Sequence, residues 1–303
     1  MSKPAFRSLT ILALCTAVAA TACTANRPSP VPTGSSGGPA ARAAVSPTVL
    51  TLEPYFANLK TVNVRVGGET LPFLFDTGGG VSLITPDVAK VAGCEPFGRL
   101  TGFRASGERL DAQRCGPIEL SLGAADPVVL HGEVAFFDLA SIMRGAPPVG
   151  GVIALSSLDG RAFTLDLGGE RLVIETPESL ADRVRTMSPL TVRASRQAGG
   201  ASLDLLLAVR TPQGPLWLEI DSGNAGPVQL SPHALRQLGA GIPKGAPEKI
   251  SLDVLGLGPM EVGAVEKDLI YDGLLNAEFL KKLVLTVDLG SLRAWAAVQS
   301  PPA

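Results

Sequence analysis

The 303-residue chain is poor in histidine, aromatic residues and net charge. Its two histidines, His131 and His233, are far apart in sequence, so a histidine-based triad or a histidine-rich metal site is hard to build. The net charge of −2 excludes the basic surface that nucleic acids require. Aromatic residues make up only 5%, whereas 34 glycines and 25 prolines favour turns and short strands over long helices. We therefore expect a protein built mainly from strands, with no nucleic-acid partner and no metal or other cofactor.

The sequence also has no hydrophobic run long enough to span a bilayer comfortably. The apolar segment 9–22 follows the positive charges of Lys3 and Arg7 and ends in small residues. This pattern is typical of a signal peptide, which we assign to residues 1–22, and it predicts export. The alternative is an uncleaved anchor.

The residue after this segment is Cys23, which follows Ala20-Thr21-Ala22. The arrangement resembles a bacterial lipobox, and the resemblance implies that Cys23 carries a lipid. Ala20 stands where a lipobox usually has leucine, so plain secretion after Ala22 stays open. Residues 23–48 are rich in Pro, Gly, Ser and Ala and are predicted to form a flexible linker. We expect a protein of the bacterial periplasm or cell envelope, anchored to a membrane through the lipid.

The cysteines fit an exported protein. Cys15 leaves with the signal peptide, and the folded part keeps only Cys94 and Cys115. Disulfides persist outside the cytosol, so we predict a bridge between them that closes a loop of roughly twenty residues. The alternative is two buried free thiols.

One sequence pattern occurs twice, over residues 62–86 and 203–232. Each copy predicts a strand, a tight turn, a second strand and an acidic corner, and Val62, Val64 and Val66 of the first copy alternate with period two. Each is followed by a short helix that begins with Pro and ends with Gly, over 86–93 and 232–239. Segments 162–174 and 283–296 then align without a gap, so that Thr164 matches Thr286. An internal duplication explains these matches and predicts an N-terminal lobe at 49–178, a connection at 179–200 and a C-terminal lobe at 201–298.

The acidic corners carry the candidate chemistry: they are Asp76-Thr77-Gly78 and Asp221-Ser222-Gly223. Glycine lets the backbone bend tightly, and the small hydroxyl can hydrogen-bond to the opposite corner. If the corners meet, the carboxyl groups of Asp76 and Asp221 share one proton. The ionised group can then activate a water while the protonated group polarises a carbonyl. For a single corner, the alternative is an ordinary turn with a capping aspartate.

The segments FLFDTGGG and LEIDSGNAG resemble the catalytic corners of the aspartic peptidase clan, which includes pepsins and retropepsins. The resemblance covers roughly residues 50–298. It extends to GGVIALSSL (150–158) and DGLLNAEFL (272–280), which look like the apolar segments beneath those corners. It implies an all-β, bilobal, pepsin-like acid protease fold made of two retropepsin-like repeats. It also implies peptide-bond hydrolysis by Asp76 and Asp221.

The same resemblance places a substrate-covering flap at residues 98–107, with Gly102 and Gly107 for mobility and Phe103 as an apolar tip. An ordinary exposed hairpin is the alternative. Because one chain holds both corners, a monomer acting on peptides or unfolded proteins is expected.

The chain departs from the clan's pattern at four positions around the corners: Gly79, Asn224, Ala154 and Asn276. Ala154 and Asn276 stand where the clan usually has glycine. These changes favour the main alternative, a catalytically inactive protein that binds a peptide or envelope component in the same fold. A serine hydrolase is a weaker alternative, because Ser222 does not lie in a nucleophile elbow.

Four further charged residues repeat between the copies: Asp166 and Arg171, and Asp288 and Arg293. We interpret them as turn and strand-end residues that form pairs.

Overall fold

The computed structural model describes residues 46–115, 118–123, 127–130, 132–243 and 245–299. The predicted signal peptide, nearly all of the predicted linker with Cys23, and His131 lie outside the described residues. Within the described ranges, no helix has the length and apolar character needed to cross a membrane.

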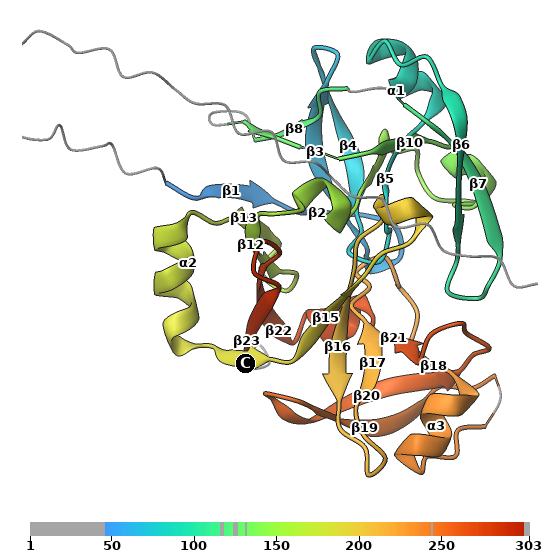
Figure 1. Cartoon of the computed structure of the whole chain (residues 1–303), viewed down its shortest axis with the longest axis vertical. Coiled ribbons are helices and arrows are strands. Elements are labelled where there is room, and N and C mark those ends of the chain that lie inside the picture. The colour runs from blue at the N-terminus through green and yellow to red at the C-terminus, as the bar shows by residue number, and fades with distance from the viewer. Residues whose placement is uncertain (1–45, 116–117, 124–126, 131, 244, 300–303) are drawn as a thin grey trace, which may run out of the picture. The chain divides into compact units, whose positions relative to one another are not determined.

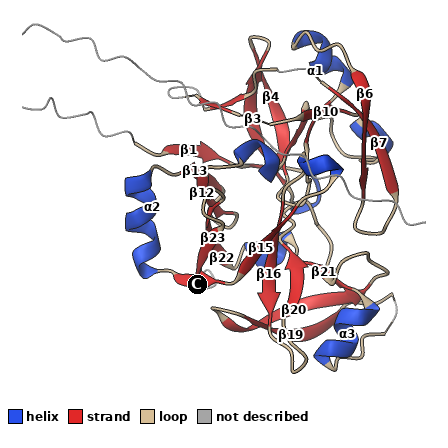
Figure 2. Cartoon of the chain, in the orientation of Figure 1, coloured by secondary structure: helices blue, strands red, loops and turns tan. Residues whose placement is uncertain are grey.

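Strands form three sheets in the described part of the chain, and the helices are short (Figures 1 and 2). The N-terminal lobe sheet has the order β6-β7-β10-β5-β11-β4-β3-β8-β9, with β2 paired to β3. Its strands are β2 (Glu53–Pro54), β3 (Lys60–Val66), β4 (Glu69–Phe75), β5 (Ser82–Ile84), β6 (Phe97–Phe103), β7 (Arg109–Arg114), β8 (Ser121–Leu122), β9 (Val128–Val129), β10 (Val134–Phe136) and β11 (Gly151–Ile153).

The C-terminal lobe sheet has the order β15-β16-β17-β21-β18-β20-β19. Its strands are β15 (Val192–Ser195), β16 (Asp204–Val209), β17 (Leu216–Glu219), β18 (Val228–Leu230), β19 (Glu248–Val254), β20 (Gly258–Glu266) and β21 (Gly273–Leu274). The α-helices are α1 (Pro86–Val91), α2 (Pro177–Arg183), α3 (Pro232–Leu238) and α4 (Ala277–Leu280). Short 3-10 helices are η1 (Phe56–Asn58), η2 (Leu139–Ser141), η3 (Leu155–Leu158), η4 (Val184–Thr186) and η5 (Ala198–Gly200).

The third sheet is shared by both halves of the duplication, in the order β1-β13-β12-β22-β23-β14. Its strands are β1 (Thr48–Thr51), β12 (Ala162–Asp166), β13 (Arg171–Ile174), β14 (Ser188–Leu190), β22 (Leu283–Asp288) and β23 (Arg293–Val298). Strands β12 and β22 pair antiparallel with Thr164 opposite Thr286, and the two hydroxyl oxygens lie 2.8 Å apart. The residues that match between the repeats therefore meet at the centre of this sheet.

The repeated hairpin β3–β4 forms as its sequence predicts. Val62, Val64 and Val66 alternate into the core, and the turn residues Gly67 and Gly68 have φ of 56° and 88°. Positive φ at both turn positions matches the right-handed twist of the strands, and glycine adopts it without strain.

The predicted short helices are confirmed as α1 and α3, each with a proline in its first turn. Ser231 caps α3 by accepting a hydrogen bond from the Ala234 N–H, and Gly239 ends it in the left-handed conformation. The charged pairs at the repeated strand ends are also present. Arg171 Nη2 lies 2.8 Å from Asp166 Oδ2, and Arg293 Nη2 lies 3.8 Å from Asp288 Oδ2.

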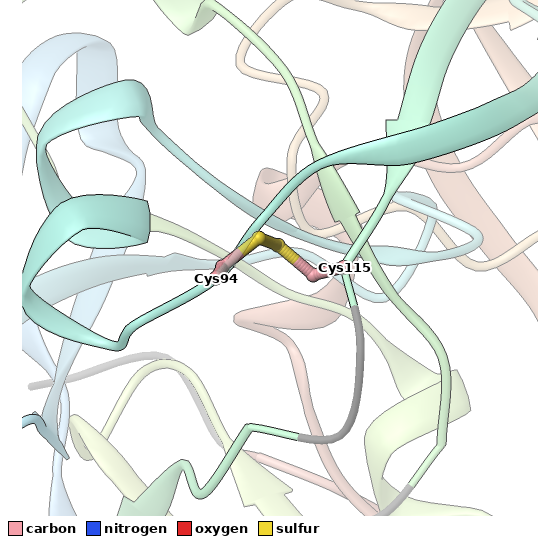
Figure 3. The surroundings of a disulfide bond; sticks show 2 residues. All are labelled: Cys94 and Cys115. Carbon is pink, nitrogen blue, oxygen red and sulfur yellow. A yellow bond between two sulfur atoms is a disulfide. The ribbon is translucent and has the colours of Figure 1, made fainter.

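A disulfide joins Cys94, just after α1, to Cys115 at the end of β7 (Figure 3). It spans 21 positions of sequence and ties the helix to the strand that returns from the predicted flap. Of the two states that the sequence allowed for these cysteines, the structure has the bridge.

Candidate active site

Each acidic corner follows the end of a strand that has neighbours on both sides. Asp76 comes after β4, which lies between β3 and the parallel strand β11. Asp221 comes two residues after β17, which lies between β16 and the parallel strand β21. Because both strands are central in their sheets, the backbone that carries each carboxyl group is fixed.

The two corners hold each other through reciprocal hydrogen bonds. The Thr77 N–H donates to Ser222 Oγ and the Ser222 N–H donates to Thr77 Oγ1, each over 3.0 Å. Each hydroxyl then donates to a carbonyl of the opposite strand: Thr77 to Ile220 at 2.6 Å, and Ser222 to Phe75 at 3.0 Å. Both hydroxyl residues are buried, so this network satisfies every polar group that it encloses.

The glycines of the corners allow very close approach. A Cβ atom added to Gly223 would lie 2.4 Å from Asp76 Oδ2, which is far inside contact distance. The Gly78 N–H donates to Asp76 Oδ1 at 3.0 Å, and the Gly223 N–H donates to Asp221 Oδ1 at 2.8 Å. The structure thus brings Asp76, Asp221 and their predicted supporting residues into one buried site.

The carboxyl groups of Asp76 and Asp221 share a hydrogen bond, and their environments differ. Burial raises the pKa of Asp76, and hydrogen bonds from the Gly78 N–H, Asp221 and the Gly223 N–H counter this in part. Burial, the negative charge of Asp76 and the hydrogen bond to Asp76 raise the pKa of Asp221 well above its usual value. Burial and mutual repulsion therefore favour a pair that carries one proton, with one carboxyl group donating the hydrogen bond and the other accepting it.

Two further carboxyl groups, those of Asp204 and Glu219, lie beside the pair, and the sequence analysis did not predict them. Strands β16 and β17 pair antiparallel with Leu206 opposite Glu219. The Ile220 N–H donates to the Leu205 carbonyl, so the pairing continues and places Asp204 opposite Asp221. Glu219, Asp204 and Asp221 thus share one face of the hairpin. Asp204 and Glu219 are 6% and 4% exposed.

Burial raises the pKa of both extra groups. For Asp204 burial and then the charge of Asp76 raise the pKa to about 7. For Glu219 burial and then the charges of Asp204, Asp221 and Asp76 raise the pKa well above its usual value. An alignment of the two repeats could have pointed to these groups. The positions that match Asp204 and Glu219 in the first copy are the apolar residues Leu59 and Leu74, so an acidic residue at either place is unusual.

The departures from the clan's pattern are accommodated. Asn276 donates to the Gly226 carbonyl at 2.7 Å and accepts from the Phe279 N–H at 2.8 Å, which caps α4. Asn224 donates to the Pro227 carbonyl at 3.1 Å.

In the first corner, a Cβ on Gly79 would lie 3.2 Å from Val152 Cγ1, 3.3 Å from the Asp76 carbonyl oxygen and 3.4 Å from the Ala154 Cβ, so this glycine relieves a tight contact with Val152 and Asp76 and lies next to Ala154. With Ala154 and Asn276 in these places, the two corners still form their reciprocal hydrogen bonds.

A cavity of about 710 Å³ contains both Asp76 and Asp221, and we call it the cleft. The hairpin β6–β7 covers it at the predicted flap position, with Phe103 about half exposed. At the hairpin tip, the Ala105 carbonyl accepts a hydrogen bond from the Ile270 N–H of the C-terminal lobe at 2.9 Å. Gly107 has φ of 80° in this tip, whereas Gly102 lies in β6 without a positive φ.

Comparison with known proteins bears on the fold. No protein-family model matches the chain, and no curated protein matches it in sequence. Solved structures do match, among them basic 7S globulin from soybean (TM-score 0.56, 12% identity) and conglutin gamma from lupine seeds (TM-score 0.55, 11% identity), each covering 84% of this chain and 95% of its own.

An aspartic proteinase from Irpex lacteus also matches, with a TM-score of 0.52 and 12% identity over 84% of this chain and 98% of its own. The chain therefore has the all-β, bilobal, pepsin-like fold that the sequence predicted. Identities this low establish the fold alone.

Proposed function

We propose that the chain is an aspartic endopeptidase, which hydrolyses peptide bonds with a water activated by Asp76 and Asp221. One observation carries this proposal: two buried carboxyl groups share a hydrogen bond at the floor of a cleft, on corners that brace each other. Burying two carboxyl groups against each other is costly for stability, so a structure that holds them this firmly supports a chemical role.

We assign the shared proton to Asp221, because the charge of Asp76 as well as burial raises the pKa of Asp221. Ionised Asp76 takes a proton from water as the water oxygen bonds to the peptide carbonyl carbon, and Asp221 gives its proton to the carbonyl oxygen. The tetrahedral species then collapses. Its carbon–nitrogen bond breaks, one hydroxyl proton returns to Asp221, and the proton held by Asp76 passes to the leaving amine. Both carboxyl groups end in their starting states.

The test is cleavage of an unfolded protein and a mixed peptide pool by the full chain in detergent micelles, from pH 3 to 8. We expect Asp76→Asn and Asp221→Asn each to abolish cleavage while circular dichroism stays unchanged. The reciprocal hydrogen bonds of Thr77 and Ser222 involve neither carboxyl group, so both variants retain that bracing. Cleavage that persists in either folded variant would contradict the two-aspartate mechanism.

The second candidate is a protein that binds peptides in the same cleft without turnover. The observation that favours it is the hydrogen bond between Ala105 and Ile270, which joins the hairpin tip to the opposite lobe over the cleft. A folded parent that binds peptides and cleaves none at any pH would establish this candidate.

We also propose that the chain is exported, with residues 1–22 removed and Cys23 lipidated. The Cys94–Cys115 disulfide supports an oxidising compartment. Mass spectrometry of the mature N-terminus tests this: a diacylglycerol-modified Cys23 is expected, and an unmodified Cys23 would indicate plain secretion.

A further inference from the structure

A second, smaller cavity of about 140 Å³ adjoins the cleft, and we call it the side pocket. The two cavities share part of their lining, including Gly78, Gly79 and Phe103, so the side pocket lies next to the aspartate pair. Its walls are mostly apolar: Leu83, Leu100, Leu110, Ala135, Phe137 and Ile142. Its polar lining comes from the second half of the chain: Gln197, Ser202, Asp204 and Tyr271.

Asp204 is the charged group of the side pocket. Its side chain is more than nine-tenths buried, yet no described residue donates a hydrogen bond to its carboxyl group. Among the described residues, every fully enclosed side-chain oxygen or nitrogen has a hydrogen-bond partner. Because the Asp204 oxygens have none, they are not fully enclosed, and they reach the open space of the pocket. The neighbouring Tyr271 hydroxyl accepts a hydrogen bond from Gln197. On the other side, a Cβ on Gly80 would lie 3.5 Å from Asp204 Oδ1.

The groups that surround Asp204 are negative or neutral. Asp76, on the opposite corner, raises its pKa by charge repulsion, and Asp204 in turn raises the pKa values of Glu219 and Tyr271. No ion pair with Asp204 is formed within the described residues. The cations that line the cleft are Arg104 and Lys267, and Arg104 is 3.6 Å from the carboxylate of Glu108. The potential at Asp204 therefore attracts a positive group.

We propose that the side pocket binds the side chain of a lysine or arginine in a peptide substrate, with its cationic end on Asp204. The inference rests on the proposed peptidase function. Apolar walls suit the methylene stem of such a side chain. The Asp204 carboxyl group suits its charged end, because a bound cation favours the ionised form of this group. A metal ion is a poorer match, since no three His, Cys, Asp or Glu side chains of the described residues are placed to hold one.

The experiment compares two peptide series that differ only in lysine or norleucine at one position on either side of the cleaved bond. The full chain should cleave the lysine member with at least tenfold higher kcat/KM at one such position. Asp204→Asn should abolish this preference, and Asp204→Glu should restore part of it. Asp253→Asn removes an exposed carboxylate that pairs with Arg210, and it should leave the preference unchanged.

The outcomes separate this inference from the proposed function. Cleavage without a lysine preference in the parent overturns the side-pocket proposal and leaves the peptidase in place, and this result needs no variant to fold. A parent that cleaves nothing overturns the proposed peptidase function. Binding of the same peptides, measured by fluorescence anisotropy, then tests the side-pocket proposal. Tighter binding of lysine than norleucine that depends on Asp204 supports the side pocket, and equal binding overturns it.

Discussion

A methyl group on Gly78 would lie 2.6 Å from the carboxyl carbon of Asp221. Gly78→Ala must therefore push the two corners apart, and we expect cleavage to fall by at least a hundredfold, because catalysis depends on the alignment of the two carboxyl groups. Gly263→Ala is the matched control, since a Cβ there has no neighbour within 4 Å and should change nothing. Kinetics on both purified variants, with folding followed by circular dichroism, check this. Normal activity in Gly78→Ala would mean that the corners are further apart than described.

Thr77 links the corners through two hydrogen bonds of its hydroxyl, and valine has nearly the same shape without them. We expect Thr77→Val to lower the free energy of unfolding by about 2 to 4 kcal/mol, because the Ile220 carbonyl and the Ser222 N–H lose their buried partner. Thr77→Ser keeps the hydroxyl and should lose much less. Urea unfolding measures both, and equal losses would show that the methyl group matters more than the hydroxyl.

The raised pKa of Asp204, about 7, makes stability depend on pH. Below about pH 4 the group is protonated in both the folded and unfolded chain and has no effect. As pH rises to 7, the unfolded chain ionises first, so the folded state loses up to about 4 kcal/mol, all of it by pH 8. Asp204→Asn removes this loss.

Urea unfolding at pH 4.5 and pH 8 tests the Asp204 prediction. Asp204→Asn should be more stable than the parent at pH 8 and close to it at pH 4.5, whereas Asp253→Asn should follow the parent at both. A constant difference between Asp204→Asn and the parent would contradict the raised pKa.

The Cys94–Cys115 disulfide closes a 21-residue separation. Its removal by the double change Cys94→Ser and Cys115→Ser should lower the free energy of unfolding by about 3 kcal/mol, because the unfolded chain regains the freedom of that loop. Urea unfolding of the double variant and of the reduced parent should agree. If neither differs from the oxidised parent, the bridge contributes no net stability.

The sequence predicted the features that local chemistry determines. Gly67-Gly68 specifies a hairpin turn, the prolines at 86 and 232 start short helices, and the repeated corners show which aspartates belong together. The sequence did not predict that Asp204 and Glu219 lie beside the aspartate pair, because their place there depends on strand register. In the sequence each is one acidic residue within an apolar strand. Only the β16–β17 pairing sets both on the face of Asp221.

The sequence did not predict the pairing of β12 with β22 either. Two segments that align in sequence can stack, pair or lie apart in the structure. Period-two alternation fixes which side chains share a face and leaves the neighbouring strand open. The Thr164–Thr286 contact therefore became visible only with the structure.

The shared sheet joins two halves that no longer carry the same residues. In an assembly of two identical subunits, any carboxyl group beside one corner would appear beside the other as well. Here Asp204 and Glu219 flank one corner, while Leu59 and Leu74 hold the matching places at the other. Peptides have a direction, and two corners with unlike surroundings, one with a carboxyl group in the adjoining side pocket, can distinguish a chain from its reverse. Two unlike repeats in one chain thus give the cleft an orientation that a symmetric pair of identical subunits does not have.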